Sequence, residues 1–329
     1  MTSGALRRLG AWPRERLASL PTPLVRAPRL GAHLGVDELF VKMDSETGFA
    51  LGGNKVRKLE FELAPERLDG VTCLITAGGP QSNHCRVTAA FAARAGIRCI
   101  LVTQGPEASA PTGNALLHRL FGAEIVTVKD RDQRAPTMDS LASTVTAQGG
   151  RPLVVPIGAS TGLGCLGYAL AATELTAQLD EVGAAPGNTW LFVSTSSCGT
   201  VAGLALGLAL LGRTDIRIVG VSADASAERL LAETRRIAAE GAALLECDVS
   251  IPADAVVAVD DQVGGGYGIP TPESESAIAD FGRLEGIVLD PTYTAKAAAG
   301  MIDWIRTREP APGERVIFLH TGGHPGLFT

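Results

Sequence analysis

The stretch Gly52-Gly53-Asn54-Lys55 has the residue types of a site built around a reactive amine. Glycines let the backbone come close to a bound group, and an asparagine offers both hydrogen-bond donors and acceptors. A lysine that is partly desolvated can lose its proton and attack a carbonyl carbon. These residues would suit a Schiff base between Lys55 and an aldehyde, although a surface lysine at the start of a basic helix explains the stretch at least as well on its own.

A second polar turn lies between a predicted strand at residues 71–76 and an alanine-rich helix pattern. Its glycine and polar positions are Gly78, Gly79, Gln81, Ser82, Asn83 and His84. Ser82 and Asn83 are common N-cap residues, so one interpretation is a turn that only caps the helix. Exposed amides beside two glycines and several polar side chains also suit binding of a substrate carboxylate, with Ser82 near the reacting atoms. His84 by itself is more typical of a structural histidine than of a catalyst.

A third turn, Ser194-Thr195-Ser196-Ser197-Cys198-Gly199-Thr200, joins a predicted strand to an apolar helix. Hydroxyl groups and free amides at a helix N-terminus favour binding of a phosphate. Because no lysine follows in the arrangement of a P-loop, the turn does not predict a site for a nucleoside triphosphate. A hydroxyl-rich turn is by itself a weak indication of function.

Two of the three tyrosines lie in predicted loops rather than within helices or strands. Tyr267 belongs to Gly-Gly-Gly-Tyr-Gly, and Tyr293 belongs to Leu-Asp-Pro-Thr-Tyr-Thr. A tyrosine in such a loop can stack on a flat ligand or transfer a proton. The structural alternative, a ring that fills a gap at the surface, stays open on these residues alone.

The polar turns fall between apolar segments that alternate in type along the chain. Predicted strands cover residues 71–76, 98–103, 124–128, 153–156, 189–194, 216–221, 256–259 and 315–319. Predicted helices cover residues 83–95, 112–121, 137–147, 163–180, 200–210, 225–240, 272–284 and 294–306. Continuous apolar runs are typical of parallel strands that helices cover on both faces. The alternation predicts an α/β fold with doubly wound parallel sheets, in which ligands bind at the carboxyl ends of the strands.

Composition and charge restrict the class of protein. The chain has 329 residues, of which 46% are hydrophobic and 19% are charged, so it can bury the cores of roughly two domains. A net charge of -6 with scattered basic residues does not indicate a nucleic acid or an anionic membrane as a partner. We find no apolar run long enough for a signal sequence or a membrane span, and therefore expect a cytoplasmic protein.

Other kinds of cofactor site have little support. The six cysteines form no Cys-x-x-Cys pair, and five histidines offer little basis for a metal site. The glycines at 158, 162 and 164 lack the Gly-x-Gly-x-x-Gly pattern of a dinucleotide-binding enzyme. We therefore predict neither a metal site nor a nicotinamide cofactor.

The motifs occur in an order that resembles a known family. They run from Gly-Gly-Asn-Lys-x-Arg-Lys-Leu-Glu through Gln-Ser-Asn-His, the hydroxyl-rich turn, Gly-x-Gly-Tyr-Gly-x-Pro and Leu-Asp-Pro-x-Tyr-Thr-x-Lys to His-Thr-Gly-Gly. The chain is similar to the pyridoxal-phosphate enzymes grouped as D-cysteine desulfhydrases and 1-aminocyclopropane-1-carboxylate deaminases, with the cysteate sulfo-lyases close by. The resemblance covers nearly the whole chain, from Leu20 to Gly326.

The resemblance implies the tryptophan-synthase-β-like fold, which is fold type II of the pyridoxal-phosphate enzymes. It also implies a large cofactor-binding domain of residues 1–52 and 161–329, and a smaller inserted α/β domain of residues 53–160. A homodimer is the implied assembly, and a small amino acid is the implied substrate.

The resemblance further implies a role for each matching residue. Lys55 would bind pyridoxal 5'-phosphate as an imine, and Ser82, Tyr267 and Tyr293 would be the other catalytic residues. The cofactor-binding residues would be Lys55, Asn54, Asn83, Ser196, Ser197, Cys198, Gly199, Thr200, Thr294 and Thr321. The substrate-binding residues would be Gln81, Ser82, Asn83 and His84. Among them, Asn54 and Asn83 would lie near the phenolic oxygen of the cofactor, residues 196–200 at its phosphate, and Thr294 and Thr321 near its pyridine nitrogen.

Two positions bear on the reaction. The deaminase branch has a glutamate where this chain has Thr294, and a glutamine where it has His84. A hydroxyl keeps the pyridine nitrogen protonated less well than a carboxylate does, which favours loss of a good leaving group. We therefore expect β-elimination from a cysteine- or cysteate-like amino acid, with release of sulfide or sulfite. Ring opening of 1-aminocyclopropane-1-carboxylate and β-replacement are the alternatives.

The phosphate turn departs from the family pattern. The family's Gly-Ser-Gly-Gly-Thr corresponds here to Ser196-Ser197-Cys198-Gly199-Thr200, so two glycines are replaced. We expect either that the side chains at 196 and 198 find room or that the turn shifts. A binding protein that kept the fold without activity is a second class of function, which the yellow colour of a bound imine would exclude.

Overall fold

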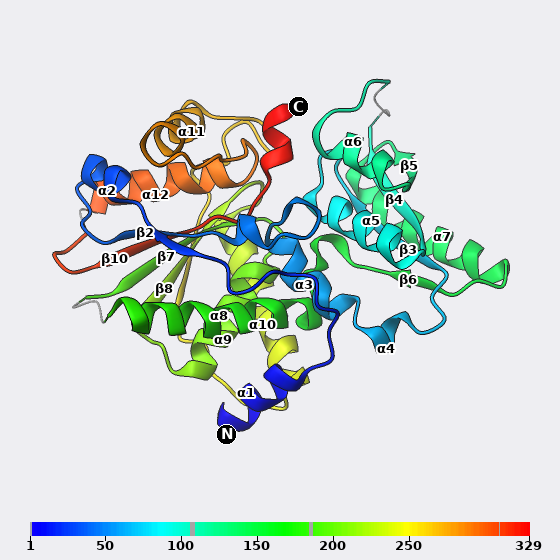
Figure 1. The fold of residues 1–329 in the computed structure, drawn as a ribbon, viewed down its shortest axis with the longest axis horizontal. Coiled ribbons are helices and arrows are strands. Elements are labelled where there is room, and N and C mark those ends of the chain that lie inside the picture. The colour runs from blue at the N-terminus through cyan, green and yellow to red at the C-terminus, as the bar shows by residue number, and fades with distance from the viewer. Residues whose placement is uncertain (1, 106–108, 184–186, 309) are drawn as a thin grey trace.

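Two separate β-sheets organise the chain, and Figure 1 shows helices packed around each of them. The computed structural model describes residues 2–105, 109–183, 187–308 and 310–329. The first sheet has the strand order β1-β2-β10-β7-β8-β9, and the second has the order β5-β4-β3-β6.

The element bounds follow the order of the chain. The strands are β1 (Leu24–Arg26), β2 (Leu39–Lys42), β3 (Cys73–Gly78), β4 (Arg98–Gln104), β5 (Glu124–Val128), β6 (Pro152–Val154), β7 (Thr189–Thr195), β8 (Ile216–Ser222), β9 (Val256–Val259) and β10 (Arg315–Leu319). The α-helices are α1 (Thr2–Ala11), α2 (Pro28–Leu34), α3 (Asn54–Glu62), α4 (Pro65–Leu68), α5 (Asn83–Ala95), α6 (Gly113–Leu120), α7 (Arg134–Ala147), α8 (Gly162–Val182), α9 (Gly199–Leu211), α10 (Ala227–Leu244), α11 (Pro272–Glu285) and α12 (Thr294–Arg308). Short 3-10 helices cover η1 (Asp44–Glu46), η2 (Phe49–Leu51), η3 (Arg131–Gln133), η4 (Ile157–Ala159) and η5 (His324–Phe328).

Side chains on the central strands of the first sheet alternate between its two faces. Trp190 and Phe192 pack in the core that α11 and α12 cover, whereas Leu191 and Val193 pack in the core that α8 and α9 cover. Successive side chains of a strand point to opposite faces, so a strand covered on both sides has a continuous apolar sequence. Figure 1 shows these two helix layers on opposite sides of the sheet.

The second sheet is built in the same way. Leu74 and Leu101 pack in one core with α3 and α5, whereas Ile75 and Val102 pack in another with α7. All neighbouring strands in this sheet are parallel, so their carboxyl ends lie at one edge. That edge presents the residues after β3 to the other half of the molecule.

The predicted α/β fold class is confirmed, and each predicted strand and helix overlaps an element of the structure. The predicted elements lack α1, β1, α2, β2 and α4. The strands β1 and β2 have only three and four residues, which is too short to show a clear period. The first sheet is also mixed rather than purely parallel, since β1 pairs antiparallel with β2. An antiparallel edge strand on an otherwise parallel sheet is a common variation.

The helix α3 lies between the two sheets, as Figure 1 shows. It packs against α8 of the first sheet and α5 of the second. Strands of the second sheet fall within residues 73–154, and those of the first sheet fall outside this interval. The arrangement is compatible with a division into residues 1–52 plus 161–329 and residues 53–160, which stays a prediction.

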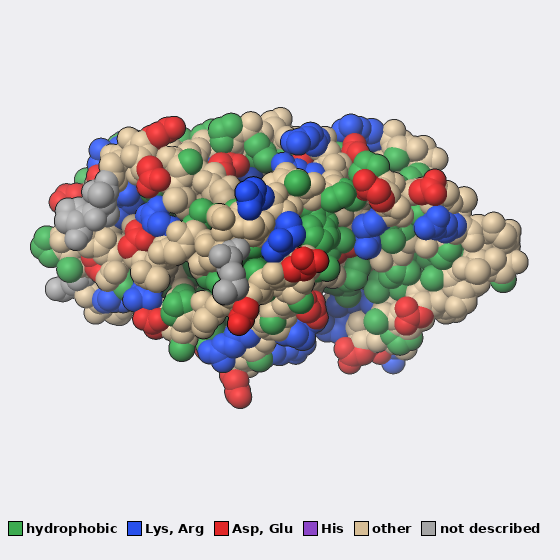
Figure 2. Space-filling view, turned by 90° about the horizontal axis from the view of Figure 1, so that it is seen from below, with side chains coloured by type: hydrophobic (Ala, Val, Ile, Leu, Met, Phe, Trp, Pro, Cys, Tyr) green, Lys and Arg blue, Asp and Glu red, His purple; other side chains and the backbone are tan. Residues whose placement is uncertain are grey.

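The surface carries charges of both signs. Figure 2 shows lysine and arginine side chains intermingled with aspartate and glutamate over the face that it draws. In the described part of the chain, we find no helix with the length and apolar character needed to cross a membrane.

Candidate active site

Residues at the carboxyl ends of strands from both sheets line one cavity, together with the first turn of α3. The sequence-predicted residues that line it are Asn54, Lys55, Ser82, Asn83, His84, Ser196, Ser197, Cys198, Thr200, Tyr267, Tyr293 and Thr321. Gln81, Gly199 and Thr294 are not among its lining residues. The fold therefore brings together turns that are far apart in the sequence.

The backbone before Lys55 is fixed against β10 and α9. The Asn54 amide donates to the Thr321 carbonyl at 2.9 Å, and the Asn54 side chain donates to Thr200 Oγ1 at 3.0 Å. Gly53 has a φ of +107°, and a Cβ there would lie 3.0 Å from the Thr321 carbonyl oxygen. Only glycine combines this conformation with so close an approach. The turn thereby holds Lys55 at the wall of the cavity.

The amine of Lys55 has a lowered proton affinity. Burial lowers its pKa from 10.5 to about 8, an interaction with Lys58 partly raises it, and the charge of Arg86 lowers it further. Lys58 is itself 1% exposed, and burial followed by the charge of Lys55 lowers its pKa well below 10.5. A lysine with a pKa near 8 has a usable neutral fraction at neutral pH, as a nucleophilic amine requires.

Sequence analysis does not identify Lys58, which links α3 to the hydroxyl-rich turn. Its Nζ donates to Ser160 Oγ at 3.0 Å, and Ser160 Oγ donates to Ser197 Oγ at 2.8 Å. Ser160 Oγ also accepts from the Gly199 amide at 3.3 Å. The signal for Lys58 is its position three residues after Lys55, because such residues share one face of a helix.

Ser82 and Asn83 combine a capping role with contact to the cavity. Ser82 Oγ accepts from the Cys85 amide at 3.2 Å, which is the N-cap bond of α5. Asn83 Oδ1 accepts from Arg86 at 2.6 Å and from Asn114 at 2.8 Å. Because its oxygen is occupied, the side-chain NH2 group of Asn83 is left to donate to a ligand. The capping and ligand-binding interpretations of this turn are therefore compatible.

Arg86 is a second residue that sequence reasoning misses. Its fully buried guanidinium donates to the Gly52 carbonyl at 2.7 Å as well as to Asn83. Burial lowers the pKa of Arg86 to about 10, with a partly opposing effect of the charge on Asp290. Arg86 therefore ties the turn before Lys55 to the start of α5. Its position four residues after Ser82 places it in the first turn of a helix that begins at the site.

Gln81 supports a neighbouring loop instead of the cavity wall. Its Oε1 accepts from the Asn114 amide at 2.8 Å, and its Nε2 donates to the Thr112 carbonyl at 3.1 Å. Both polar ends of the side chain are used in these bonds. The substrate contact expected for Gln81 stays a prediction.

His84 borders the cavity as a neutral hydrogen-bond acceptor. Thr76 Oγ1 donates to the Val155 carbonyl at 2.7 Å, so His84 Nε2 is the donor in its 2.8 Å bond to Thr76. The resulting tautomer has a bare Nδ1, which is buried without a partner. Burial, followed by the charges of Lys55 and Lys58, lowers the pKa of the imidazole well below 6.5. His84 is therefore uncharged at neutral pH.

Cys198 occupies a position where glycine is usual. It has a φ of +62° at the N-cap of α9, a left-handed conformation that glycine adopts more easily than other residues. The side chain is 3% exposed and packs in a core with Ala202 and Leu230. Its Sγ lies 3.5 Å from the Leu230 carbonyl oxygen. The side chain at 198 therefore finds room in the core behind the turn.

The hydroxyl-rich turn offers unused donors to the cavity. Ser194 Oγ and Thr195 Oγ1 are buried without a partner, and both residues line the cavity. Buried hydroxyls without a hydrogen bond are rare, and they indicate that a ligand completes them. The first turn of α9 adds the positive end of a helix dipole, which favours an anion.

Tyr267 and Tyr293 meet at the cavity wall. Their hydroxyls are 2.5 Å apart, and their rings pack edge to face with centroids 5.8 Å apart. Burial raises the pKa of Tyr267, and burial with the charge of Tyr267 raises the pKa of Tyr293 well above 10. Lys296 holds the Tyr267 loop, because its Nζ donates to the Val263 and Gly266 carbonyls at 2.7 and 2.8 Å.

Thr294 is turned away from the cavity. Its Oγ1 donates to Asp290 Oδ1 at 2.7 Å, and its amide donates to the same oxygen at 2.9 Å. Asp290 also accepts from the Tyr293 amide at 2.9 Å, so this carboxylate is used at the start of α12. Thr321, in contrast, lines the cavity. The cofactor contact expected for Thr294 stays a prediction.

The chain matches a known family and its members over almost its whole length. A family model described as pyridoxal-phosphate dependent enzyme matches residues 16–322. A protein named D-cysteine desulfhydrase from Klebsiella pneumoniae is 39% identical over 329 residues, which cover 98% of each chain. A protein of the same name from Salmonella typhi is 38% identical over 332 residues, again with 98% of each chain covered.

Solved structures share the fold. A structure described as the ACC deaminase homologue matches with a TM-score of 0.88 and 33% identity, covering 100% of this chain and 97% of that one. Threonine deaminase isoform 2 from Solanum lycopersicum has a TM-score of 0.66 and 17% identity, covers 98% of this chain and 89% of that one, and shows the fold alone. The family model, the full-length relatives and the fold type II architecture together show that this chain belongs to the pyridoxal-phosphate dependent enzymes.

Proposed function

We propose that the cavity is the active site of a pyridoxal-phosphate-dependent lyase that catalyses β-elimination on a small, cysteine- or cysteate-like amino acid. The observation that carries the proposal is the Lys55 amine, with a pKa of about 8, in one cavity with two tyrosine hydroxyls. The net reaction converts the amino acid and water into a 2-oxo acid, ammonia and the protonated leaving group. The full-length relatives named D-cysteine desulfhydrase support this reaction.

The residues of the cavity fit pyridoxal phosphate. Lys55 supplies an amine for its aldehyde, and the free NH2 group of Asn83 supplies a donor for its phenolic oxygen. The unpartnered hydroxyls of Ser194 and Thr195, beside the start of α9, supply donors for its phosphate. When bound, the cofactor withdraws electrons from the bonds at the substrate's α-carbon.

The protonation states divide the roles of base and acid. Lys55 Nζ is partly neutral at neutral pH, so it can take the proton from the α-carbon. Desolvation at the cavity raises the pKa values of Tyr267 and Tyr293, so they keep their protons and can donate one to the leaving group. The first amides of α5, with Ser82, would bind the substrate carboxylate.

The groups around Thr321 favour elimination over ring opening. Thr321 lines the cavity, whereas the carboxylate of Asp290 is bonded to Tyr293 and Thr294 outside it. A site without a carboxylate at the pyridine nitrogen makes a weaker electron sink, which is sufficient for a good leaving group. This arrangement supports β-elimination as the main reaction.

A substrate panel read for 2-oxo acid tests the proposal. It contains D- and L-cysteine, cysteate, β-chloroalanine, D-serine and 1-aminocyclopropane-1-carboxylate. We expect pyruvate from a cysteine-like member, and 2-oxobutyrate from the cyclopropane would instead identify a ring-opening deaminase. A substituted amino acid as product would identify β-replacement. A protein without the yellow imine absorbance and without turnover would contradict the proposal.

The proposal includes a homodimer in the cytoplasm. An apolar groove supports self-association, because Leu51, Leu116 and Phe328 line it with more than half of each side chain exposed. Sedimentation of the wild-type protein and of Phe328→Asp tests the assembly. We expect a dimer for the wild type and a monomer for the variant, and a wild-type monomer would contradict this part of the proposal.

A further inference from the structure

Arg134 is a buried cation at the cavity without an anionic partner. It begins α7, is 8% exposed and lines the cavity. Its Nε donates to the Arg131 carbonyl at 3.0 Å, and its terminal nitrogens make no hydrogen bond or ion pair with other described residues. An arginine that lines a cavity without an ion pair can offer its terminal N–H groups to a negatively charged ligand.

The neighbouring charged groups do not neutralise Arg134. Arg131 also lines the cavity, but its guanidinium pairs with Asp224 at 3.3 Å. Asp132 is exposed on η3, and its charge, which raises the pKa of Arg134, has the smallest of the influences on that pKa. Burial and then the charge of Arg131 lower the pKa of Arg134, although a guanidinium keeps its charge in proteins. The wall of the cavity at α7 is therefore positively charged.

Arg134 lines the same cavity as Tyr267 and the first residues of α5. It interacts electrostatically with Cys85, near the start of α5, and with Tyr267. The substrate's α-carboxylate already has donors in the first turn of α5, where the amides have no acceptor within the helix. Tyr267 is a proton donor to the leaving group in the proposed function. An anion at Arg134 would accordingly lie near the leaving group.

We propose that Arg134 forms a second anion subsite, through which the enzyme selects amino acids whose β-substituent is an oxyanion, such as a sulfonate, over neutral ones. This inference rests on the proposed β-elimination and names its substrate class. With cysteate, the Cβ–S bond breaks and sulfite leaves with the bonding electrons. Water then supplies the oxygen that gives pyruvate and ammonia, without net oxidation or reduction. Arg134 holds the sulfonate oxygens while charge moves onto the departing sulfite.

Binding of substrate analogues tests the subsite without turnover. The holoenzyme is titrated by calorimetry with 3-sulfopropionate and with butyrate, which differ at the end distant from the carboxylate. We expect Arg134→Gln to weaken binding of 3-sulfopropionate by roughly ten- to hundredfold, the range of a charge-assisted hydrogen bond, and to leave butyrate unchanged. No change, or an equal loss for both ligands, would overturn the subsite.

Two further variants control for charge and folding. Arg134→Lys keeps the positive charge and should retain more affinity for 3-sulfopropionate than Arg134→Gln does. Arg98→Gln removes an exposed arginine that pairs with Glu124 on the second sheet, so it should affect neither ligand. An equal loss of affinity for 3-sulfopropionate in Arg98→Gln would show that binding depends only on the net charge of the protein, which would overturn the inference.

Turnover separates this inference from the proposed function. We expect kcat/KM for cysteate to fall by at least about tenfold in Arg134→Gln, while that for β-chloroalanine changes by less than about threefold. Conversion of β-chloroalanine by the wild type, without any Arg134-dependent preference for cysteate, would overturn the subsite and leave the proposed function intact. Conversion of no member of the substrate panel would contradict the proposed function, and the substrate class with it.

Discussion

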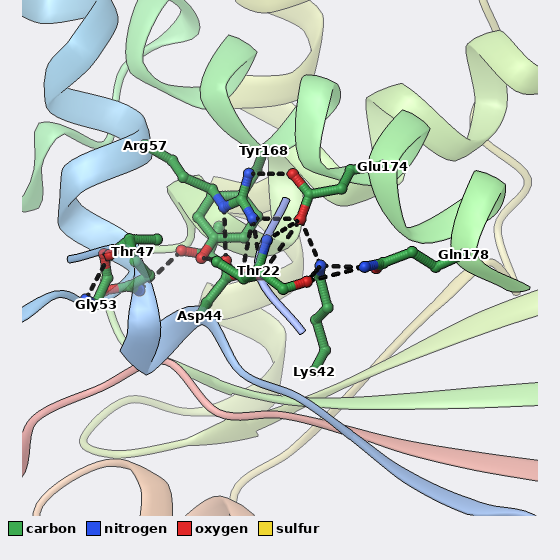
Figure 3. Close-up of polar contacts among 11 residues, drawn as sticks. Thr22, Lys42, Asp44, Thr47, Gly53, Arg57, Tyr168, Glu174 and Gln178 are labelled. Atoms are coloured by element: carbon green, nitrogen blue, oxygen red, sulfur yellow. Dashed lines mark hydrogen bonds and ion pairs between the residues drawn. The ribbon is translucent and has the colours of Figure 1, made fainter. Parts of the chain in front are cut away.

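Two polar regions lie on different sides of the first turn of α3, and they differ in how completely their groups are paired. The first, the Arg57 network, comprises Thr22, Lys42, Asp44, Arg57, Tyr168, Glu174 and Gln178 and is drawn in Figure 3. The second is the cavity at Lys55. Lys55 and Arg57 are two residues apart, so they point to different sides of the helix.

In the Arg57 network, the charged groups have partners. Arg57 donates to Asp44 Oδ2 at 2.8 Å and to Oδ1 at 2.9 Å, and it donates to Glu174 at 2.9 Å. Lys42 pairs with Glu174 and donates to the Thr22 carbonyl at 2.7 Å. Burial alone would raise the pKa of Asp44, but the charge and hydrogen bonds of Arg57 lower it. The network therefore has no need of a ligand.

In the cavity, by contrast, buried atoms lack partners. They include His84 Nδ1, Gln104 Oε1, Ser194 Oγ, Thr195 Oγ1 and Asp224 Oδ1. Both the Arg57 network and the cavity at Lys55 contain buried polar groups, so burial and polarity do not distinguish a binding site from a structural cluster. Incomplete hydrogen bonding does distinguish them. The paired region should govern stability, and the unpaired region should govern activity.

The largest expected effect is the loss of activity in Lys55→Ala. Because this variant removes the amine that we propose holds the cofactor and accepts the α-proton, turnover should fall by at least roughly a thousandfold. The imine absorbance should disappear, while the melting temperature of the apoprotein changes little. Turnover assays, absorbance spectra and thermal melts of apoprotein check these outcomes. Retained absorbance and turnover would remove Lys55 from the mechanism.

Arg57→Met should lower the stability of the protein, in contrast to the loss of activity in Lys55→Ala. It leaves Asp44 and Glu174 without their shared cation, and loss of one partner from a buried ion pair costs about 3–5 kcal/mol of unfolding free energy. Urea unfolding of the apoprotein measures the change. A loss below about 1 kcal/mol, or a variant that stays fully stable but inactive, would break the proposed division between the two regions.

Lys58→Met should weaken cofactor binding rather than folding. Lys58 reaches the hydroxyl-rich turn through Ser160, so its loss removes a hydrogen-bond donor that supports this turn at the expected phosphate. We expect the dissociation constant of pyridoxal phosphate to rise by up to about tenfold, as for the loss of one buried hydrogen bond. Ser160→Ala, which removes the link but keeps the amine, should show a smaller rise. An unchanged dissociation constant in Lys58→Met would place Lys58 with the structural residues.

The smallest expected effect is the pH dependence of cofactor uptake. Since the pKa of Lys55 is lowered to about 8, the reactive neutral amine increases as the pH rises through this value. The initial rate at which apoprotein forms the imine should therefore rise by roughly tenfold between pH 7 and pH 9. Stopped-flow absorbance gives this profile. A rate that keeps rising steeply up to pH 10 would indicate a lysine without a lowered pKa.

The site could be predicted best from the sequence where the residues that carry the chemistry also mark the start of a helix. The turns at Lys55, Ser82 and Thr200 each precede a helix after a glycine or hydroxyl run, so their types and positions could be predicted. The predicted strands beyond residue 70 were recognisable because burial on both faces leaves continuous apolar runs.

Contacts between distant segments could not be predicted in the same way. Arg134 and Lys58 resemble ordinary helix residues in the sequence, and only the fold brings them to the cavity or the phosphate turn. Gln81 shows the reverse case, since it lies in a ligand-binding motif yet bonds to residues 112–114. The position of a residue within a sequence motif does not determine the direction in which its side chain points.

Lys55 is the lysine proposed to hold the cofactor, and three further lysines of the chain are buried: Lys42, Lys58 and Lys296. Reduction of the holoenzyme with borohydride, followed by peptide mass spectrometry, identifies the modified lysine directly. We predict a pyridoxyl-phosphate adduct on Lys55 alone. An adduct on Lys58, Lys42 or Lys296, or a holoenzyme with no adduct, would contradict the account.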